Sequence, residues 1–183
     1  MFDQSLPFAM VQKRRNKFRT AETYQQELIY KFHCYNRRCG IKYIVSIKQY
    51  KDEFLTLDYY PKINLTPKKH SLDNIQDLRY RMLTKQNSFG SIGATILDIM
   101  IDVEQMTSIK NWGFLAANLP DESSNENNKR YQVYKEVLSR TFYRRYAVFG
   151  NKENSAIFVI DKRREQEKQR IIEEYEQIFS ETN

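Results

Sequence analysis

The sequence contains little glycine, proline or cysteine. Its 183 residues include 5 Gly, 4 Pro and 2 Cys. A chain with so few glycines and prolines is neither collagen-like nor of low complexity. Two cysteines are too few for a disulfide-dense scaffold, and a chain of this length buries enough surface to fold without one. We therefore expect one globular domain, or one domain with a terminal extension.

Long apolar runs and a secretion signal are also missing. No stretch approaches the roughly 20 apolar residues that span a bilayer, so we expect no membrane partner. The first basic residues, Lys13, Arg14 and Arg15, follow the apolar residues of the N-terminus instead of preceding them. This order is the reverse of a secretion signal. The sequence therefore predicts a cytoplasmic protein, or one within a virion, that is not secreted through a signal peptide.

Metal-ligating side chains are scarce. Cys34 and Cys39 flank a turn, His33 lies beside the first of them, and His70 is the only other histidine. A structural zinc site needs four ligands, which these residues do not supply at a suitable spacing. We predict that the chain has no metal site, and that both cysteines are reduced because a cell-interior setting disfavours disulfides.

Positive charge is concentrated at the N-terminus. The formal net charge is +7, and residues 1–20 contain five cations against Asp3 alone: Lys13, Arg14, Arg15, Lys17 and Arg19. Such a segment is either an arm that contacts phosphates or an acidic protein, or a solvated tail. We predict three parts, namely a basic arm (1–23), one α/β domain (24–161) and a C-terminal helix (162–183).

Alternating apolar residues predict three strands over 26–35, 41–49 and 53–60. Their short connections favour an antiparallel meander. A short helix is expected from Ser71 to Met82, because apolar residues recur there at helical spacing.

The second half of the sequence predicts helices alternating with strands. The strongest helical stripe begins near Gly93, and the apolar run 112–117 is typical of a central buried strand. A helix over 127–142, a hairpin of 146–149 with 155–160, and a helix over 161–179 follow. The first half of the last helix is polar, and Lys162, Arg163 and Arg164 in its first turn oppose the helix dipole. We therefore expect this segment to project from the domain or to meet an anionic partner. The predicted fold class is mixed α/β (α+β), with helices packed on a largely antiparallel sheet.

Residues 88–160 resemble the core of the GNAT acetyltransferase superfamily. In that family a strand leads into a Q/R-x-x-G-x-G/A turn, then a helix, a strand, a second helix and two strands. Gly93 takes the second glycine position of the turn, whereas Ser91 and Ser88 stand at the first glycine and the leading position. The resemblance implies that coenzyme A would lie against backbone amides at the start of the helix. The residues implied are Ser91, Ile92, Gly93 and Ala94.

The resemblance also assigns a role to Tyr134. The family has an Asn seven residues before a Tyr that protonates the leaving thiolate, and Asn127 and Tyr134 have this spacing. Tyr134 also fits the buried stripe of the helix over 127–142. Where the family closes that helix with Gly-Phe, this chain has Ser139-Arg140. The segment is also similar to small uncharacterised proteins of bacteriophages and mobile elements.

Three functions remain open from the sequence. Our first hypothesis is a non-catalytic accessory or structural protein, encoded by a phage or mobile element, that uses no cofactor. It would bind a protein assembly or nucleic acid through its basic arm and terminal helix, and it could form an oligomer. The second is an acetyl-CoA-dependent N-acyltransferase using Tyr134, and the third is a nucleic-acid-binding regulator. The residues expected to bind a partner are Lys13, Arg14, Arg15, Lys17, Arg19, Arg144 and Arg145.

Overall fold

The computed structural model describes residues 4–16, 24–35, 40–50, 54–62, 89–117 and 126–182. The helix expected over 71–82 lies outside these residues. The elements, in chain order, are β1 (Phe8–Arg15), β2 (Gln26–Tyr35), β3 (Gly40–Tyr50), β4 (Phe54–Pro61), α2 (Phe89–Thr107), β5 (Trp112–Leu115), α3 (Lys129–Phe142), β6 (Tyr146–Asn151), β7 (Ala156–Asp161), the 3₁₀ helix η2 (Lys162–Glu167) and α4 (Lys168–Thr182).

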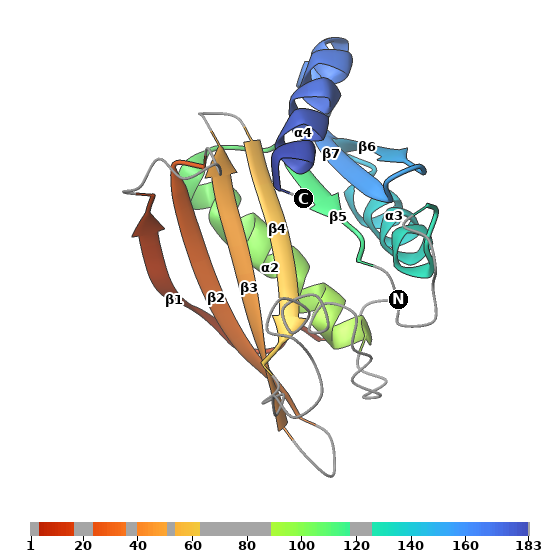
Figure 1. The fold of residues 1–183 in the computed structure, drawn as a ribbon. Helices are drawn as coiled ribbons and strands as arrows, with labels where there is room; N and C mark the ends of the chain where they lie inside the picture. The colour runs from red at the N-terminus through yellow and green to blue at the C-terminus, as the bar shows by residue number, and fades with distance from the viewer. Residues whose placement is uncertain are drawn as a thin grey trace, which may run out of the picture.

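All seven described strands form one sheet in the order β1-β2-β3-β4-β5-β7-β6 (Figure 1). Every neighbouring pair is antiparallel except β4 and β5, which are parallel. The predicted fold class, a mixed α/β fold with helices packed on a largely antiparallel sheet, is confirmed.

The meander from β2 to β4 follows from the alternating pattern. Leu28, Tyr30 and Phe32 on β2 are almost completely buried on one face, where Val45 and Ile47 of β3 join them. Successive strand residues point to opposite faces, so this pattern fixes the register. The three strands predicted here are confirmed, and each of their ends lies within one residue of the predicted position.

Helices cover both faces of the sheet. In Figure 1, α2 and α3 lie behind the strands and α4 lies in front. The apolar stripe of α2, which includes Ile99, Met100 and Val103, packs into the larger core cluster with the inner face of β2 to β5. The stripe was read correctly, but α2 begins at Phe89, four residues before Gly93. None of the helices that the structure describes has the length and apolar character needed to cross a membrane.

The second half of the C-terminal helix packs on the sheet, whereas the exposed residues 165–170 of its first half extend beyond the strands (Figure 1). Its buried residues form a second core cluster with Phe54, Ala156, Phe158 and Ile160: they are Ile171, Tyr175, Ile178 and Phe179. The basic first turn of η2, which suggested a projecting helix, is capped by the Asp161 side chain. That carboxylate accepts from the Arg163 backbone amide at 3.0 Å and forms an ion pair with the Arg163 side chain at 2.6 Å. Residues 171–179 therefore belong to the folded body.

Part of the expected N-terminal arm is a strand. Phe8–Arg15 pairs antiparallel with β2, with a register irregularity between Met10 and Gln12. Seven of its eight residues are exposed. The sequence therefore lacks the alternation of buried and exposed residues that would predict a strand here. The domain thus begins earlier than the predicted boundary at residue 24.

Gly113 on β5 is required by close packing against α4. A Cβ atom there would lie 2.5 Å from Tyr175 Cδ1 and 2.9 Å from Phe179 Cζ. Both distances are below van der Waals contact, so only glycine admits these rings. The Tyr175 hydroxyl, in turn, donates to the Leu55 carbonyl at 3.0 Å and accepts from the Leu55 amide at 3.2 Å.

Candidate functional site

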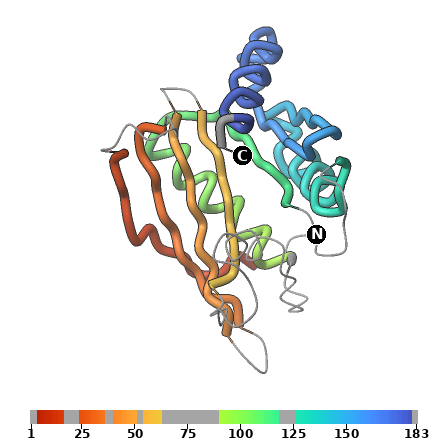
Figure 2. The backbone as a smooth tube through the Cα atoms, in the orientation of Figure 1, coloured from red at the N-terminus to blue at the C-terminus, as the bar shows by residue number. Residues whose placement is uncertain are grey.

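The parallel strands β4 and β5 pair only briefly and then diverge. Their register is limited to Leu55 with Trp112 and Thr56 with Gly113. Beyond this point β4 stays with β3 as far as Pro61, whereas β5 stays with β7 (Figure 2). Tyr175 of α4 bonds to the backbone of Leu55, in the short paired segment. The fold therefore opens its sheet at one defined place.

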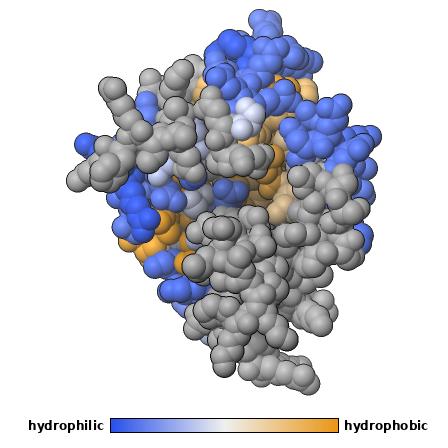
Figure 3. Space-filling model, in the orientation of Figure 1, coloured by the Kyte–Doolittle hydropathy of each residue, from blue (hydrophilic) through white to orange (hydrophobic). Residues whose placement is uncertain are grey.

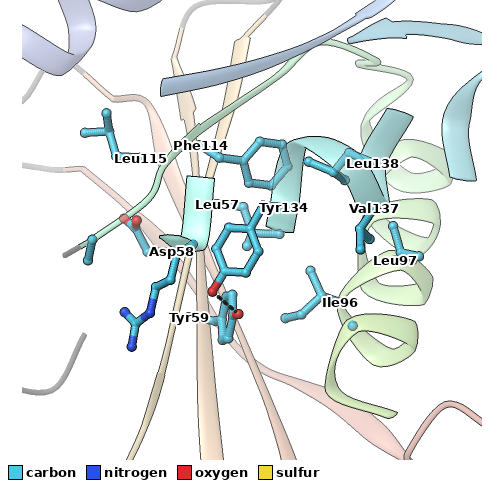
Figure 4. A pocket seen from close by; sticks show the side chains of 13 residues that line it. Leu57, Asp58, Tyr59, Ile96, Leu97, Phe114, Leu115, Tyr134, Val137 and Leu138 are labelled. Atoms are coloured by element: carbon cyan, nitrogen blue, oxygen red, sulfur yellow. Dashed lines mark hydrogen bonds between the residues drawn. The ribbon is translucent and has the colours of Figure 1, made fainter. Parts of the chain in front are cut away.

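An apolar pocket of about 80 Å³ lies in this opening. By the same measure a single water needs roughly 10–15 Å³, so the pocket admits a narrow chain of atoms. Its walls come from β4, α2, β5 with the residues after it, and α3 (Figure 4): Leu57, Asp58, Tyr59, Gly93, Ile96, Leu97, Phe114, Leu115, Ala117, Arg130, Tyr134, Val137 and Leu138. Figure 3 shows apolar surface near β5, between the polar surfaces of α3 and α4.

Strand alternation places pocket residues on both faces of the sheet. Leu57 and Tyr59 belong to the face covered by α2 and α3, and Asp58 between them points to the opposite face. Phe114 and Leu115 divide in the same way between the two core clusters. Because side chains from both faces line it, the pocket reaches through the sheet where the strands part.

Two tyrosine hydroxyls meet inside the pocket. Tyr59 Oη and Tyr134 Oη form a hydrogen bond of 2.5 Å, drawn dashed in Figure 4. Burial raises the pKa of Tyr59 well above its ordinary value, and the neighbouring Tyr134 raises it further. Burial also raises the pKa of Tyr134, against smaller opposing effects of the hydrogen bond with Tyr59 and the charge of Arg130. Both phenols are therefore neutral at physiological pH, and each has a proton to donate.

The start of α3 is anchored to the strands beside the pocket. The Asn128 side chain accepts from the Tyr131 amide at 2.8 Å as the N-cap, and it donates to the Ala116 carbonyl at 2.5 Å. The backbone amide of Asn128 donates to Ser155 Oγ at 3.1 Å. These bonds fix the position of Tyr134, two turns along the helix. The capping residue is thus Asn128, and Asn127, which the resemblance singled out, is its exposed neighbour.

The residues expected to hold a cofactor lie in the first turns of α2. Gly93 lines the pocket, and Ile92 and Ala94 are buried. The Ser91 carbonyl accepts from the Thr95 hydroxyl at 2.7 Å. Because α2 begins at Phe89, the amides of Gly93 and Ala94 belong to the helical hydrogen-bond ladder. The amides outside that ladder are those of the first turn, which precede Gly93.

The residues expected to bind a partner fall into separate groups. Lys13, Arg14 and Arg15 lie on β1, and Arg144 and Arg145 lie in the turn between α3 and β6. Strands β1 and β6 are the two edges of a seven-stranded sheet, so six strand spacings, about 29 Å, separate them. The structure therefore does not bring these two groups together. Lys17 and Arg19 lie outside the described residues.

Sequence reasoning identified Gly93 and Tyr134 but missed Asp58, Tyr59 and Arg130. Nothing in the local pattern distinguishes Tyr59 from other strand tyrosines, since its role depends on contact with a helix 75 residues away. Within the described ranges, no group of three or more His, Cys, Asp or Glu side chains is arranged to hold a metal ion. We compared the chain with protein-family models, with curated proteins and with solved structures. None of the three comparisons found a match.

Proposed function

We propose that this domain is a GNAT-type N-acyltransferase that binds an acyl-coenzyme A thioester where β4 and β5 diverge. The observation that carries the proposal is the Tyr59–Tyr134 pair inside an apolar pocket that reaches through the sheet. The order of elements from α2 to β7 is also the one that the resemblance implies. Of the three functions open from the sequence, this one makes direct use of the pocket.

The pocket residues fit an acyl thioester and its thin pantetheine arm. Leu57, Ile96 and Leu97 offer an apolar wall to methylene groups. The first-turn amides of α2 carry the positive end of the helix dipole, which favours a pyrophosphate. Arg130, which also lines the pocket, adds a positive charge. The apolar wall would therefore contact the pantetheine arm, and the positive charges would contact its anionic end.

Two pocket side chains supply the proton transfers of acyl transfer. Asp58 is the carboxylate among the lining residues and would accept the proton lost by the attacking amine nitrogen as that nitrogen bonds to the thioester carbonyl carbon. Tyr134, a neutral phenol hydrogen-bonded to Tyr59, would donate its proton to the sulfur as the C–S bond breaks. Since Asp58 and Tyr134 stand on opposite faces of the sheet, amine and thioester would enter from opposite sides.

Acetyl-CoA binding is the first test. A ligand present at one hundred times its Kd stabilises the folded state by about 2.7 kcal/mol, which raises the Tm of a chain of this size by roughly 5–10 °C. We expect Val137→Trp to abolish the shift, because Val137 lines the pocket. Val133→Trp, one turn earlier on the same helix and 45% exposed, is the matched control and should keep the shift.

Catalysis is tested separately with Tyr134→Phe. We expect this variant to bind acetyl-CoA normally and to lower kcat with a small amine acceptor by about 10²–10⁴-fold, since it removes a general acid. If folded wild-type protein shows no shift with millimolar acetyl-CoA, the proposal is wrong. Binding without any effect of Val137→Trp would place the ligand elsewhere and would also overturn it.

A non-catalytic role in a protein assembly is a second candidate, and the exposed strand β1 favours it. Met10 and Val11 are 43% and 45% exposed beside Lys13 and Arg15, and β1 pairs only with β2 in the described sheet. An edge strand of this kind can accept a further strand from an acidic partner. Lys13→Glu with Arg15→Glu should then abolish assembly, measured as the mass of the particle formed. An unchanged mass would remove this candidate.

A further inference from the structure

A second concave surface lies at the other end of α2, away from the pocket. It consists of two adjoining hollows, of about 510 and 310 Å³, that share Ser108 and Lys110. The larger hollow is lined by Arg144 and Arg145, and the smaller by Arg163 and Arg164. We call this surface the basic groove. Gly93 in the pocket and Gln105 in the groove are twelve residues apart on α2, which is about 18 Å along the helix axis.

The floor of the groove is a rigid polar cluster. Glu104 is buried, and its carboxylate accepts from Trp112 Nε1 at 2.9 Å and from the Tyr146 hydroxyl at 2.5 Å. These bonds tie α2 to β5 and β6. Among the described residues, the Glu104 carboxylate takes its hydrogen bonds from these two neutral donors and forms no ion pair with Arg144 or Arg145.

The turn that carries the rim arginines is fixed at its backbone. The Lys162 amide donates to the Arg145 carbonyl at 3.1 Å, and Lys162 Nζ donates to the Tyr143 carbonyl at 2.6 Å. The Arg145 amide donates back to Phe142 at 3.1 Å. The side chains of Arg144 and Arg145 are therefore presented by an ordered turn.

Aromatic rings accompany these cations. The Arg144 guanidinium lies 5.6 Å from the centre of the Tyr143 ring, and that of Arg145 lies 5.5 Å from the centre of the Tyr146 ring. Tyr143 lies next to Arg144 at the edge of the groove, outside the residues that line the two hollows. Its side chain is 57% exposed, and its hydroxyl accepts a hydrogen bond from Arg144 Nε at 3.0 Å. Among the described residues, the ion pairs at the groove involve Asp161 with Arg163 and Glu167 with Arg164. Neither pair includes Arg144 or Arg145.

We propose that the basic groove binds single-stranded nucleic acid. Arg144, Arg145 and Lys110 would contact phosphates along the backbone, and the exposed Tyr143 ring would stack on a base. An acidic protein would use the same cations but would gain little from an exposed ring beside them. The combination of cations and an exposed ring therefore favours nucleic acid over an acidic polypeptide.

The test uses a fluorescently labelled 20-nucleotide oligothymidine and fluorescence anisotropy at several salt concentrations. We expect Arg144→Ala with Arg145→Ala to weaken binding at least tenfold at low salt. Because each single-strand phosphate contact contributes about 0.7 to the slope of log K against log salt, the slope should fall by about 1.4. Tyr143→Ala should weaken binding by about tenfold, and Tyr143→Phe, which keeps the ring, should bind like the wild type.

A matched control has the same change in net charge outside the groove. Arg140→Ala with Arg170→Ala removes two exposed arginines that pair with Glu136 and Glu167, and it should change the affinity by less than twofold. Equal losses in both double variants would show that only net charge matters and would overturn the proposal. Absence of oligothymidine binding would overturn it as well, as would polyglutamate that binds more tightly than the oligonucleotide at equal charge.

Discussion

Gly113→Ala tests whether α4 is an integral part of the sheet's packing. The added Cβ would lie 2.5 Å from Tyr175 Cδ1, so the ring or the strand must move. Tyr175 is completely buried, and its ring packs edge-on against Phe54 at 5.1 Å. Overpacking of a well-packed core costs about 1–3 kcal/mol, while replacing glycine in a strand returns about 0.5–1 kcal/mol. Central values of about 2 and 0.75 kcal/mol leave an expected net destabilisation of about 1 kcal/mol.

Urea unfolding followed by fluorescence of Trp112 measures this loss. A companion variant, Tyr175→Leu, removes the ring that the new methyl group would meet and the hydroxyl bonds to Leu55. If the steric argument holds, Gly113→Ala should cost at least 1 kcal/mol less in the Tyr175→Leu background than in the wild type. Equal costs in the two backgrounds, or a neutral Gly113→Ala, would refute the reasoning.

Three further changes test the polar interior. Tyr131 Oη is buried and has no hydrogen-bond partner in the described part of the chain, so Tyr131→Phe should raise the free energy of unfolding by about 1 kcal/mol in urea titrations. Glu104→Ala leaves the Trp112 and Tyr146 donors without their acceptor and should lower it by about 3 kcal/mol in the same assay. Hydrogen bonds from Arg163 lower the pKa of Asp161, so its contribution is complete above the unfolded pKa near 4 and is lost as pH falls through the lower folded value. Unfolding of the wild type and Asp161→Asn from pH 5 to pH 2 should therefore converge at the acid end.

Local pattern predicts the elements whose two faces differ. β2 could be predicted because buried Leu28, Tyr30 and Phe32 alternate with more exposed neighbours. β1 could not be predicted in this way, because it lies at the edge of the sheet and almost all of its side chains are exposed to water. The same limit applies to α4: the pattern shows an apolar stripe, but it does not show that Tyr175 meets Gly113, 62 positions earlier.

The candidate site depends on contacts that no local pattern contains. Gly93 and Tyr134 could be selected because the resemblance supplied positions for them. Asp58 and Tyr59 could not be selected, because the sequence pattern of β4 resembles that of the neighbouring strands. Only the structure shows that β5 separates from β4 after Gly113. The basic groove is an intermediate case. The Tyr-Arg-Arg-Tyr run from Tyr143 to Tyr146 is visible in the sequence, but the anchoring of its backbone by Lys162 is not.

The pocket and the basic groove stand at opposite ends of one rigid helix, and their chemistry differs for a structural reason. At the pocket end the sheet opens, so apolar side chains from α2 and α3 are left facing a space that a strand would otherwise fill. At the groove end the sheet is closed by Trp112 and Tyr146 bonding to Glu104, and cations gather at the rim, outside that closed core. The pocket therefore suits a largely apolar and narrow ligand, whereas the rim of the groove suits an anionic ligand that remains in contact with water.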